Sequence, residues 1–129
     1  MKAILITGGA GFVGSYLAIK FKAYYPQVDV ICLDNLKRRG SELNLPRLKS
    51  AGIQFVHGDI RNKEDFEGLP PIDLILEASA EPSVLAGIQS TPDYLLNTNL
   101  NGTINCLNFA VRHQAKFIFL STSRVYPIR

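Results

Sequence analysis

The 129-residue sequence has little cysteine or histidine, two of each, and no tryptophan. Two cysteines cannot form the dense disulfide framework of small secreted domains, and neither stands in a metal-ligand spacing. We therefore predict that Cys32 and Cys106 are reduced, buried thiols and that the chain holds no metal. The sequence also offers no Ser-His-Asp arrangement that would activate a serine as a nucleophile.

Long hydrophobic runs are also absent. Although 47% of the residues are hydrophobic, no apolar stretch approaches the roughly 20 residues that a membrane-spanning helix needs. Met1 and Lys2 lead directly into a short apolar run, so we expect no signal peptide, no membrane partner and a cytoplasmic location. The length fits one domain, residues 1–129.

An excess of one charge is nearly absent, because the net charge is only +3. The basic residues are concentrated in one loop, Lys37-Arg38-Arg39, and no basic stripe interleaved with aromatic residues occurs elsewhere. We therefore expect no nucleic-acid partner. The loop is interpreted as solvated or as close to a cofactor phosphate.

The sequence does contain apolar periodicity, which predicts that strands alternate with helices five times. Pro46 predicts that one helical segment is broken in two, and Thr91 and Pro92 are typical of an N-cap and a first helical position. The predicted strands are 2–6, 28–33, 53–57, 72–76 and 116–120. The predicted helices are 12–25, 41–50, 62–66 with Asn62 as its cap, and 91–113, while 77–90 is a loop with a weak helical turn. This alternation predicts an α/β fold, a three-layer αβα arrangement around a doubly wound parallel sheet with strand order 3-2-1-4-5.

The stretch from Thr7 to Gly14 joins the first strand to the first helix and is rich in glycine. Such a turn lets the backbone approach a pyrophosphate, and the free N–H groups at the start of the helix face the anion. Two registers fit the spacing, since Gly8 or Gly9 can precede Gly11 and Gly14. Phe12 and Val13, between the last two glycines, are included among the predicted cofactor contacts.

Asp34 follows Gly14 by 20 positions, at the end of the second predicted strand. A dinucleotide-binding fold places a carboxylate there to accept hydrogen bonds from the adenosine ribose. A carboxylate repels a 2′-phosphate, which favours NAD, while Arg38 and Arg39 keep NADP as the less favoured cofactor. The alternative is a turn aspartate that only ends the strand.

Polar or small residues also follow the later strands, whose ends line the same crevice in such a sheet. Asp59 could accept a hydrogen bond from an adenine amino group, with Ile60 beside it. The small residues Ala78-Ser79-Ala80 allow a flat ligand to approach, and Asn99 could turn into the crevice. Thr122 could hydrogen-bond a substrate oxygen. For each position, ordinary turn or strand-end composition is the alternative.

The runs TGGAGFVGS, GDIR, TNLNGT and FLSTSRVY resemble the extended short-chain dehydrogenase/reductase family, and within it the NAD-dependent epimerase/dehydratase group. The resemblance covers the whole chain and implies a Rossmann-type fold, bound NAD and the glycine register Gly8, Gly11 and Gly14. It further implies that three residues of the loop after Asp34 contact the cofactor, namely Asn35, Leu36 and Arg39.

The resemblance also implies a reaction, in which a carbon of a nucleotide sugar is transiently oxidised and the hydride is returned. Thr122 stands at the family's Ser/Thr position, where it would hydrogen-bond the reacting hydroxyl. The family's Tyr-x-x-x-Lys pair does not follow it, and Tyr16 to Lys20 has this spacing only in the first helix. Leu76-Glu77 also departs from the His-Leu that the family often has.

We therefore expect an N-terminal fragment that is inactive alone. Its substrate domain and the end of its Rossmann fold would lie downstream, and the full-length protein would act on a nucleotide sugar. In this family the helix at 92–113 commonly contributes to a dimer interface, so a homo-oligomer is expected. A non-catalytic NAD(P)-sensing protein of the same fold is the alternative.

Overall fold

The computed structural model describes residues 1–81, 83 and 91–122. Its strands are β1 (Ala3–Thr7), β2 (Asp29–Asp34), β3 (Gln54–His57), β4 (Leu74–Glu77) and β5 (Lys116–Phe119). Its α-helices are α1 (Phe12–Tyr24), α2 (Leu45–Ser50), α3 (Asp93–Leu96) and α4 (Gly102–His113). Short 3₁₀ turns form η1 (Ser41–Asn44) and η2 (Lys63–Phe66), and a π-helical segment forms η3 (Asn97–Asn101).

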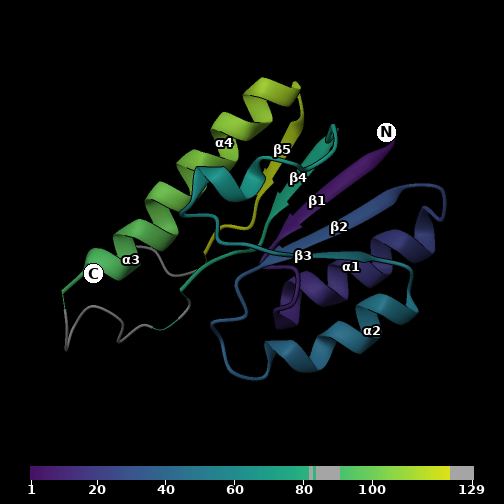
Figure 1. Cartoon of the computed structure of the whole chain (residues 1–129), viewed down its shortest axis with the longest axis horizontal. Helices are drawn as coiled ribbons and strands as arrows, with labels where there is room; N and C mark the ends of the chain where they lie inside the picture. Colours follow the sequence, from purple (N-terminus) through teal and green to yellow (C-terminus); the bar gives the residue numbers. More distant parts are fainter. Residues whose placement is uncertain (82, 84–90, 123–129) are drawn as a thin grey trace, which may run out of the picture.

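The strands form one parallel sheet in the order β3-β2-β1-β4-β5. Helices α1 and α2 cover one face, and α3 and α4 cover the other (Figure 1). The predicted doubly wound three-layer arrangement and its strand order are therefore confirmed. In such a sheet the carboxyl ends of all strands meet at one edge, which is where ligands bind.

The central strand β1 is buried along its whole length because helices pack on both sides of it. Leu5 belongs to a hydrophobic cluster with Ile75 and Phe109 on the α4 side. Ile4 belongs to a second cluster, with Leu48 on the α1 and α2 side. Period-2 alternation thus sends successive residues of one strand into two separate cores, which explains its unbroken apolar sequence.

The helical segment after residue 90 differs from the prediction. It begins at Asp93 with Pro92 at the N-cap position, so the prediction that Thr91 is the N-cap is wrong. The π-helical η3 also separates α3 from α4. Asparagine side chains compete with helical backbone bonding, and in η3 the Nδ2 of Asn101 donates to Oδ1 of Asn97 at 2.7 Å.

The other boundaries lie within one or two residues of the prediction. The predicted two-part helix at 41–50 is confirmed as η1 followed by α2, with Pro46 in the first turn of α2. Asn62 occupies the N-cap position of η2, as predicted, but its side chain makes no cap hydrogen bond. Most of the predicted weak helical turn lies outside the described residues. Cys32 and Cys106 are free and buried, as predicted.

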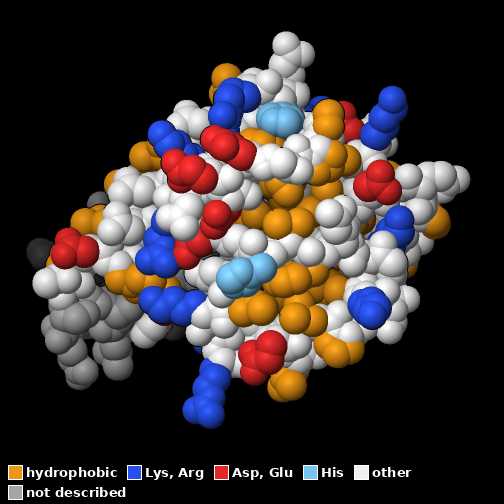
Figure 2. All heavy atoms as spheres, viewed as in Figure 1, with side chains coloured by type: hydrophobic (Ala, Val, Ile, Leu, Met, Phe, Trp, Pro, Cys, Tyr) orange, Lys and Arg blue, Asp and Glu red, His pale blue; other side chains and the backbone are white. Residues whose placement is uncertain are grey.

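The face of the molecule seen in Figure 1 carries both charged and hydrophobic side chains. Figure 2 shows basic and acidic side chains interspersed on this face rather than gathered by sign. Hydrophobic side chains reach the surface in its middle, where the edge strand β3 runs, and Phe55 and Val56 of that strand are only partly buried. In the part of the chain that the structure describes, no helix is long and apolar enough to span a membrane.

Candidate cofactor site

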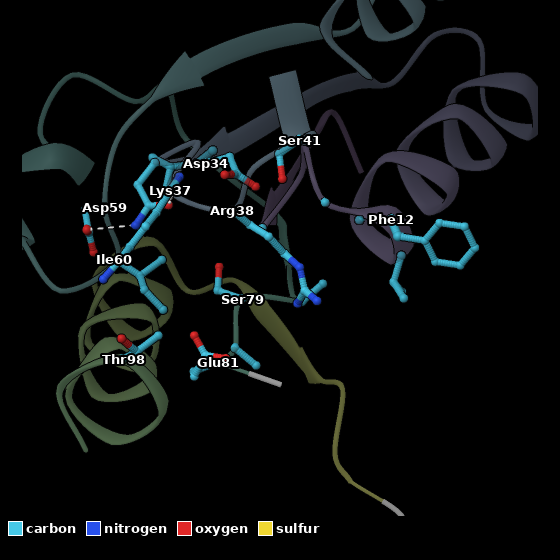
Figure 3. A pocket seen from close by; sticks show the side chains of 18 of the residues that line it. Phe12, Asp34, Lys37, Arg38, Ser41, Asp59, Ile60, Ser79, Glu81 and Thr98 are labelled. Carbon is cyan, nitrogen blue, oxygen red and sulfur yellow. Dashed lines mark hydrogen bonds between the residues drawn. The ribbon is translucent and has the colours of Figure 1, made fainter. Parts of the chain in front are cut away.

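A cavity of about 670 Å³ opens at the carboxyl edge of the sheet. This volume is in the range of pockets that hold a cofactor. Its wall combines the β1–α1 turn, the segments that follow β2, β3 and β4, and α3 and η3 (Figure 3). The predicted site residues in the wall are Gly8, Gly11, Phe12, Val13, Gly14, Asp34, Asn35, Asp59, Ile60, Ala78, Ser79 and Ala80.

The glycine turn packs so closely against neighbouring backbone that several of its glycines leave no room for a side chain. Gly8 has φ +64°, and a Cβ atom on it would lie 2.7 Å from the carbonyl oxygen of Ala78. A Cβ on Gly14 would lie 2.1 Å from the carbonyl oxygen of Gly8. Gly9 does not line the cavity, because it packs against β2, where its Cβ would lie 2.4 Å from that of Cys32. Within this turn, the glycines at 8, 11 and 14 are thus the ones that face the cavity.

The first turn of α1 offers backbone donors to this cavity. Gly11 is the N-cap and has no side-chain cap hydrogen bond, and the first turn carries no acidic residue. Within the described residues, the N–H groups of Phe12, Val13 and Gly14 make no hydrogen bond. An anion such as a pyrophosphate fits here, because unpaired N–H groups and the helix dipole both favour negative charge. The ring of Phe12 is 90% exposed and points away from the cavity (Figure 3).

Asp34 joins the glycine turn to the loop that follows β2. Its Oδ2 accepts from the backbone N–H of Ala10 at 3.1 Å, and its Oδ1 accepts from that of Leu36 at 2.8 Å. Each carboxylate oxygen retains further acceptor capacity toward the cavity. Asp34 can therefore bind ribose hydroxyls while it holds the turn.

Asp59 lies at the far end of the cavity and is already paired. Its carboxylate accepts from Nε and Nη2 of Arg61, at 2.9 and 2.6 Å, and from Nδ2 of Asn35 at 3.0 Å. The hydrogen bonds from Arg61 lower the pKa of Asp59, and those from Asn35 act in the same direction. Asp59 is thus an ionised acceptor, as an adenine amino group would require, but it shares its oxygens with protein donors.

The basic loop reaches the cavity through different residues than expected. Lys37 and Arg38 line the wall, and Arg38 extends into the cavity (Figure 3). Nζ of Lys37 lies 3.4 Å from the ring centre of Tyr94, so the loop meets α3 over the cavity. Leu36, with φ +54°, and Arg39 lie outside the wall. Positive charge therefore stands close to the Asp34 carboxylate.

Asn99 and Thr122 also lie outside the wall of the cavity. Asn99 instead contacts a residue of the wall, since its Oδ1 accepts a hydrogen bond from the N–H of Glu81 at 2.8 Å. Thr122 is exposed, and the residues after it lie outside the described part of the chain. Leu120, directly after β5, lines the cavity instead.

Sequence reasoning missed several wall residues, namely Leu33, Ser41, Gly58, Glu81, Tyr94, Thr98 and Leu120. Tyr94 and Thr98 are four positions apart and so share one helical face. That spacing is visible in the sequence, but only the tertiary fold shows that this face closes the cavity. Among the described residues, no group of three or more His, Cys, Asp or Glu side chains could hold a metal ion.

Comparison with known proteins identifies the family to which this chain belongs. Residues 4–128 match the NAD dependent epimerase/dehydratase family. The chain belongs to this family. The CDP-paratose 2-epimerase of Salmonella typhi is 40% identical over an alignment that covers 95% of this chain and 37% of that protein.

Solved structures of epimerases and dehydratases share the fold. ADP-L-glycero-D-manno-heptose-6-epimerase of Helicobacter pylori superposes with a TM-score of 0.82 at 30% identity, over 95% of this chain and 39% of that one. The dTDP-glucose 4,6-dehydratase of Bacillus anthracis, solved in complex with NAD, gives 0.79 at 27% identity, over 95% and 38% of the two chains. The chain thus spans well under half the length of the relatives that it matches.

Proposed function

We propose that this chain binds NAD in the cavity, as the cofactor-binding part of an enzyme that epimerises or dehydrates a nucleotide sugar. The supporting observation is the set of unpaired N–H groups of Phe12, Val13 and Gly14, which open into a cavity bounded by Asp34. These amides would hold the pyrophosphate and Asp34 the adenosine ribose. The bound dinucleotide would supply the hydride acceptor.

The remaining wall residues divide between the two ends of such a ligand. Asp59 and Ile60 would lie at the adenine end, and Ala78 to Ala80 at the nicotinamide end. Asn35 would orient Asp59, to which it donates at 3.0 Å. Three predicted contacts lie outside the wall, and we assign them supporting roles in the neighbouring loops: Leu36, Arg39 and Asn99.

The substitution D34N tests this assignment by calorimetric titration with NAD and with NADP. The amide loses the charge and presents one donor where Asp34 now accepts from Ala10 and Leu36. A hydrogen bond to a charged group contributes about 1.5–3 kcal/mol, so we expect NAD affinity to fall about tenfold or more. NADP affinity falls less, because the variant no longer repels the 2′-phosphate.

The control for this titration is D29N, at the exposed opposite end of β2, which should bind NAD as the wild type does. Wild-type preference for NADP would contradict the choice of NAD, since Lys37 and Arg38 would then outweigh Asp34. A wild-type chain that binds neither nucleotide would refute the proposed site.

We further propose that the 129-residue chain does not turn over a nucleotide sugar by itself. Thr122 would serve as the Ser/Thr of the catalytic set, hydrogen-bonding the reacting hydroxyl, but the sequence contains no Tyr-x-x-x-Lys pair after it. Conversion of a CDP- or UDP-sugar by the purified chain would contradict this. The loop Asp34-Asn35-Leu36, followed by Arg39-Gly40, and Thr122 are similar to CDP-paratose 2-epimerase, which makes CDP-sugars the first substrates to test.

A second candidate is an NAD(P)-sensing protein without chemistry, because the described wall of the cavity consists of groups that could bind a dinucleotide whether or not a reaction follows. The coding sequence downstream of codon 129 discriminates between the two. A downstream Tyr-x-x-x-Lys pair supports the enzyme, and a stop codon supports the sensor.

A further inference from the structure

Glu77 is a buried carboxyl directly behind the cavity. It is the last residue of β4, and only 1% of it is exposed. The wall segment Ala78 to Glu81 begins immediately after it. Strand pairing places Glu77 beside Thr7, the last residue before the glycine turn. Glu77 does not line the cavity itself, so any effect on a ligand must pass through its neighbours.

The two oxygens of Glu77 have different surroundings. Oε1 lies 2.8 Å from Oγ1 of Thr103, whereas Oε2 is buried with no hydrogen-bond partner among the described residues. The elements packed around it bring Thr7 from β1, Phe119 from β5 and Cys106 from α4. Within the same part of the chain, no cation pairs with Glu77.

These surroundings favour the neutral acid. Burial is the larger influence on the pKa of Glu77 and raises it, while the contact with Thr103 acts in the opposite direction. The titratable neighbour that the described residues bring to it is Cys106, whose pKa burial and the Glu77 charge both raise, so that thiol also stays neutral. A buried carboxylate without a cation is costly, and protonation removes that cost.

A count of hydrogens at Thr103 leads to the same protonation state. Its Oγ1 lies 2.8 Å from Oε1 of Glu77 and also 3.1 Å from the carbonyl oxygen of Asn99. One hydroxyl has a single hydrogen, which cannot be donated to two acceptors at full strength. If the Glu77 acid donates to Thr103, the Thr103 hydroxyl donates to Asn99 and both contacts are satisfied.

Asn99 continues this chain to the cavity wall. Its Oδ1 accepts from the N–H of Glu81 at 2.8 Å, and its Nδ2 donates to the carbonyl oxygen of Glu81 at 3.4 Å. Asn99 lies in the π-helical η3, and such segments often mark functional sites. The side chain of Asn99 therefore holds both backbone groups of one wall residue, and Thr103 holds the backbone of Asn99.

We propose that Glu77 is a positioning residue of the cofactor cavity: as a neutral acid it orients Thr103, which fixes Asn99 and, through Asn99, the wall at Glu81. The identity of the ligand, NAD, rests on the proposed function, whereas the chain of contacts from Glu77 to Glu81 does not. Loss of the proton would turn the Thr103 hydroxyl to the carboxylate and release the Asn99 carbonyl. NAD affinity should therefore fall as the pH rises through the pKa of Glu77.

The first measurement needs no ligand. The carboxyl ¹³C signal of Glu77 in the labelled 129-residue chain, followed against pH, should titrate above the range of a free glutamate. Exchange of the Glu81 amide proton should be slow and should quicken about fivefold in T103V, which loses a hydrogen bond of about 1 kcal/mol. T103S should restore the wild-type exchange rate, because it restores the hydroxyl.

The second measurement is NAD affinity against pH across the titration of Glu77, in the wild type, E77Q and T103V. The side-chain amide that E77Q introduces can donate to Thr103 but cannot titrate, so this variant should keep the affinity that the wild type has below the pKa of Glu77 and lose its pH dependence. T103V should bind about fivefold more weakly below that pKa. A merely structural Glu77 would leave the pH profile unchanged by E77Q.

A Glu77 carboxyl that titrates as a free glutamate does, or T103V that exchanges the Glu81 amide as the wild type does, would overturn the proposal. These two results stand whether or not NAD binds. A wild-type chain that fails to bind NAD refutes the proposed function alone, and slow Glu81 exchange that T103V quickens would then still support the chain of contacts.

Discussion

Gly14 is the residue of the glycine turn that leaves the least room for a side chain. A Cβ on it would lie 2.1 Å from the carbonyl oxygen of Gly8, which is backbone and cannot rotate away. Gly14 is also buried in the first turn of α1. An alanine there must move the turn itself, which is the part of the molecule that faces the cavity.

We expect G14A to lower the free energy of unfolding by about 3 kcal/mol, at the upper end of overpacking costs, and to abolish NAD binding. The matched variant is G11A, whose Cβ would lie 3.1 Å from the same oxygen, a contact that small shifts relieve. Urea unfolding of the two variants provides the comparison. Equal losses of stability would show that the turn adapts more freely than these distances allow.

Single residues also show where sequence reasoning succeeds and fails. The glycines and Asp34 were predictable because the turn and the strand end have fixed chemical requirements at fixed spacings. The pairing of Asp59 with Arg61 was not, although the two are only two positions apart, because turn geometry and not spacing decides it. No spacing in the sequence singles out Glu77, and only the fold shows that it is buried beside Thr7.

At the scale of elements, η1 supports the glycine turn from outside. Nδ2 of Asn44, the last residue of η1, donates to the carbonyl oxygen of Ala10 at 2.8 Å. The amide of the same residue, Ala10, donates to Asp34. Ala10 therefore anchors the turn at both of its backbone groups, its N–H to Asp34 of β2 and its carbonyl oxygen to Asn44 of η1.

N44A should loosen the turn without unfolding the chain. A lost hydrogen bond of about 1 kcal/mol predicts amide exchange of the turn that is about fivefold faster, and NAD affinity reduced by a similar factor. Asn108, exposed on α4, supplies the control N108A, for which we expect no change. Hydrogen exchange measured by mass spectrometry would contradict this support if the two variants behaved alike.

Periodicity predicted the elements well where packing reinforces it, as in β1, where both faces are buried. It failed at the start of α3, because residue type favours Thr91 as the N-cap and Pro92 as the first helical residue, whereas the structure has Pro92 at the N-cap. It also could not predict the π-helical η3, which depends on side-chain bonds such as that from Asn101 to Asn97. Local propensity alone predicts neither the first residue of α3 nor the π-helical segment.

At the scale of the whole molecule, the outer face of α3, η3 and α4 carries an exposed apolar stripe. Its residues recur at helical spacing and each is at least 42% exposed: Leu96, Leu100, Ile104, Leu107 and Val111. Their neighbours Cys106 and Phe109 point the other way, into the core. An apolar surface of this continuity is typical of an interaction site.

We predict that a second copy of the chain covers this stripe, so that sedimentation velocity shows self-association that increases with concentration. The double variant L100E/V111E should weaken it about tenfold or more, because two apolar side chains would be replaced by charges that lose hydration when buried. L43E, at an equally exposed leucine of η1, should associate as the wild type does. Because the stripe lies on the helix whose other contacts hold the cavity wall, association should also slow amide exchange at Glu81. A wild type that sediments as a monomer at high concentration, or an L43E variant as impaired as L100E/V111E, would exclude this face as the contact.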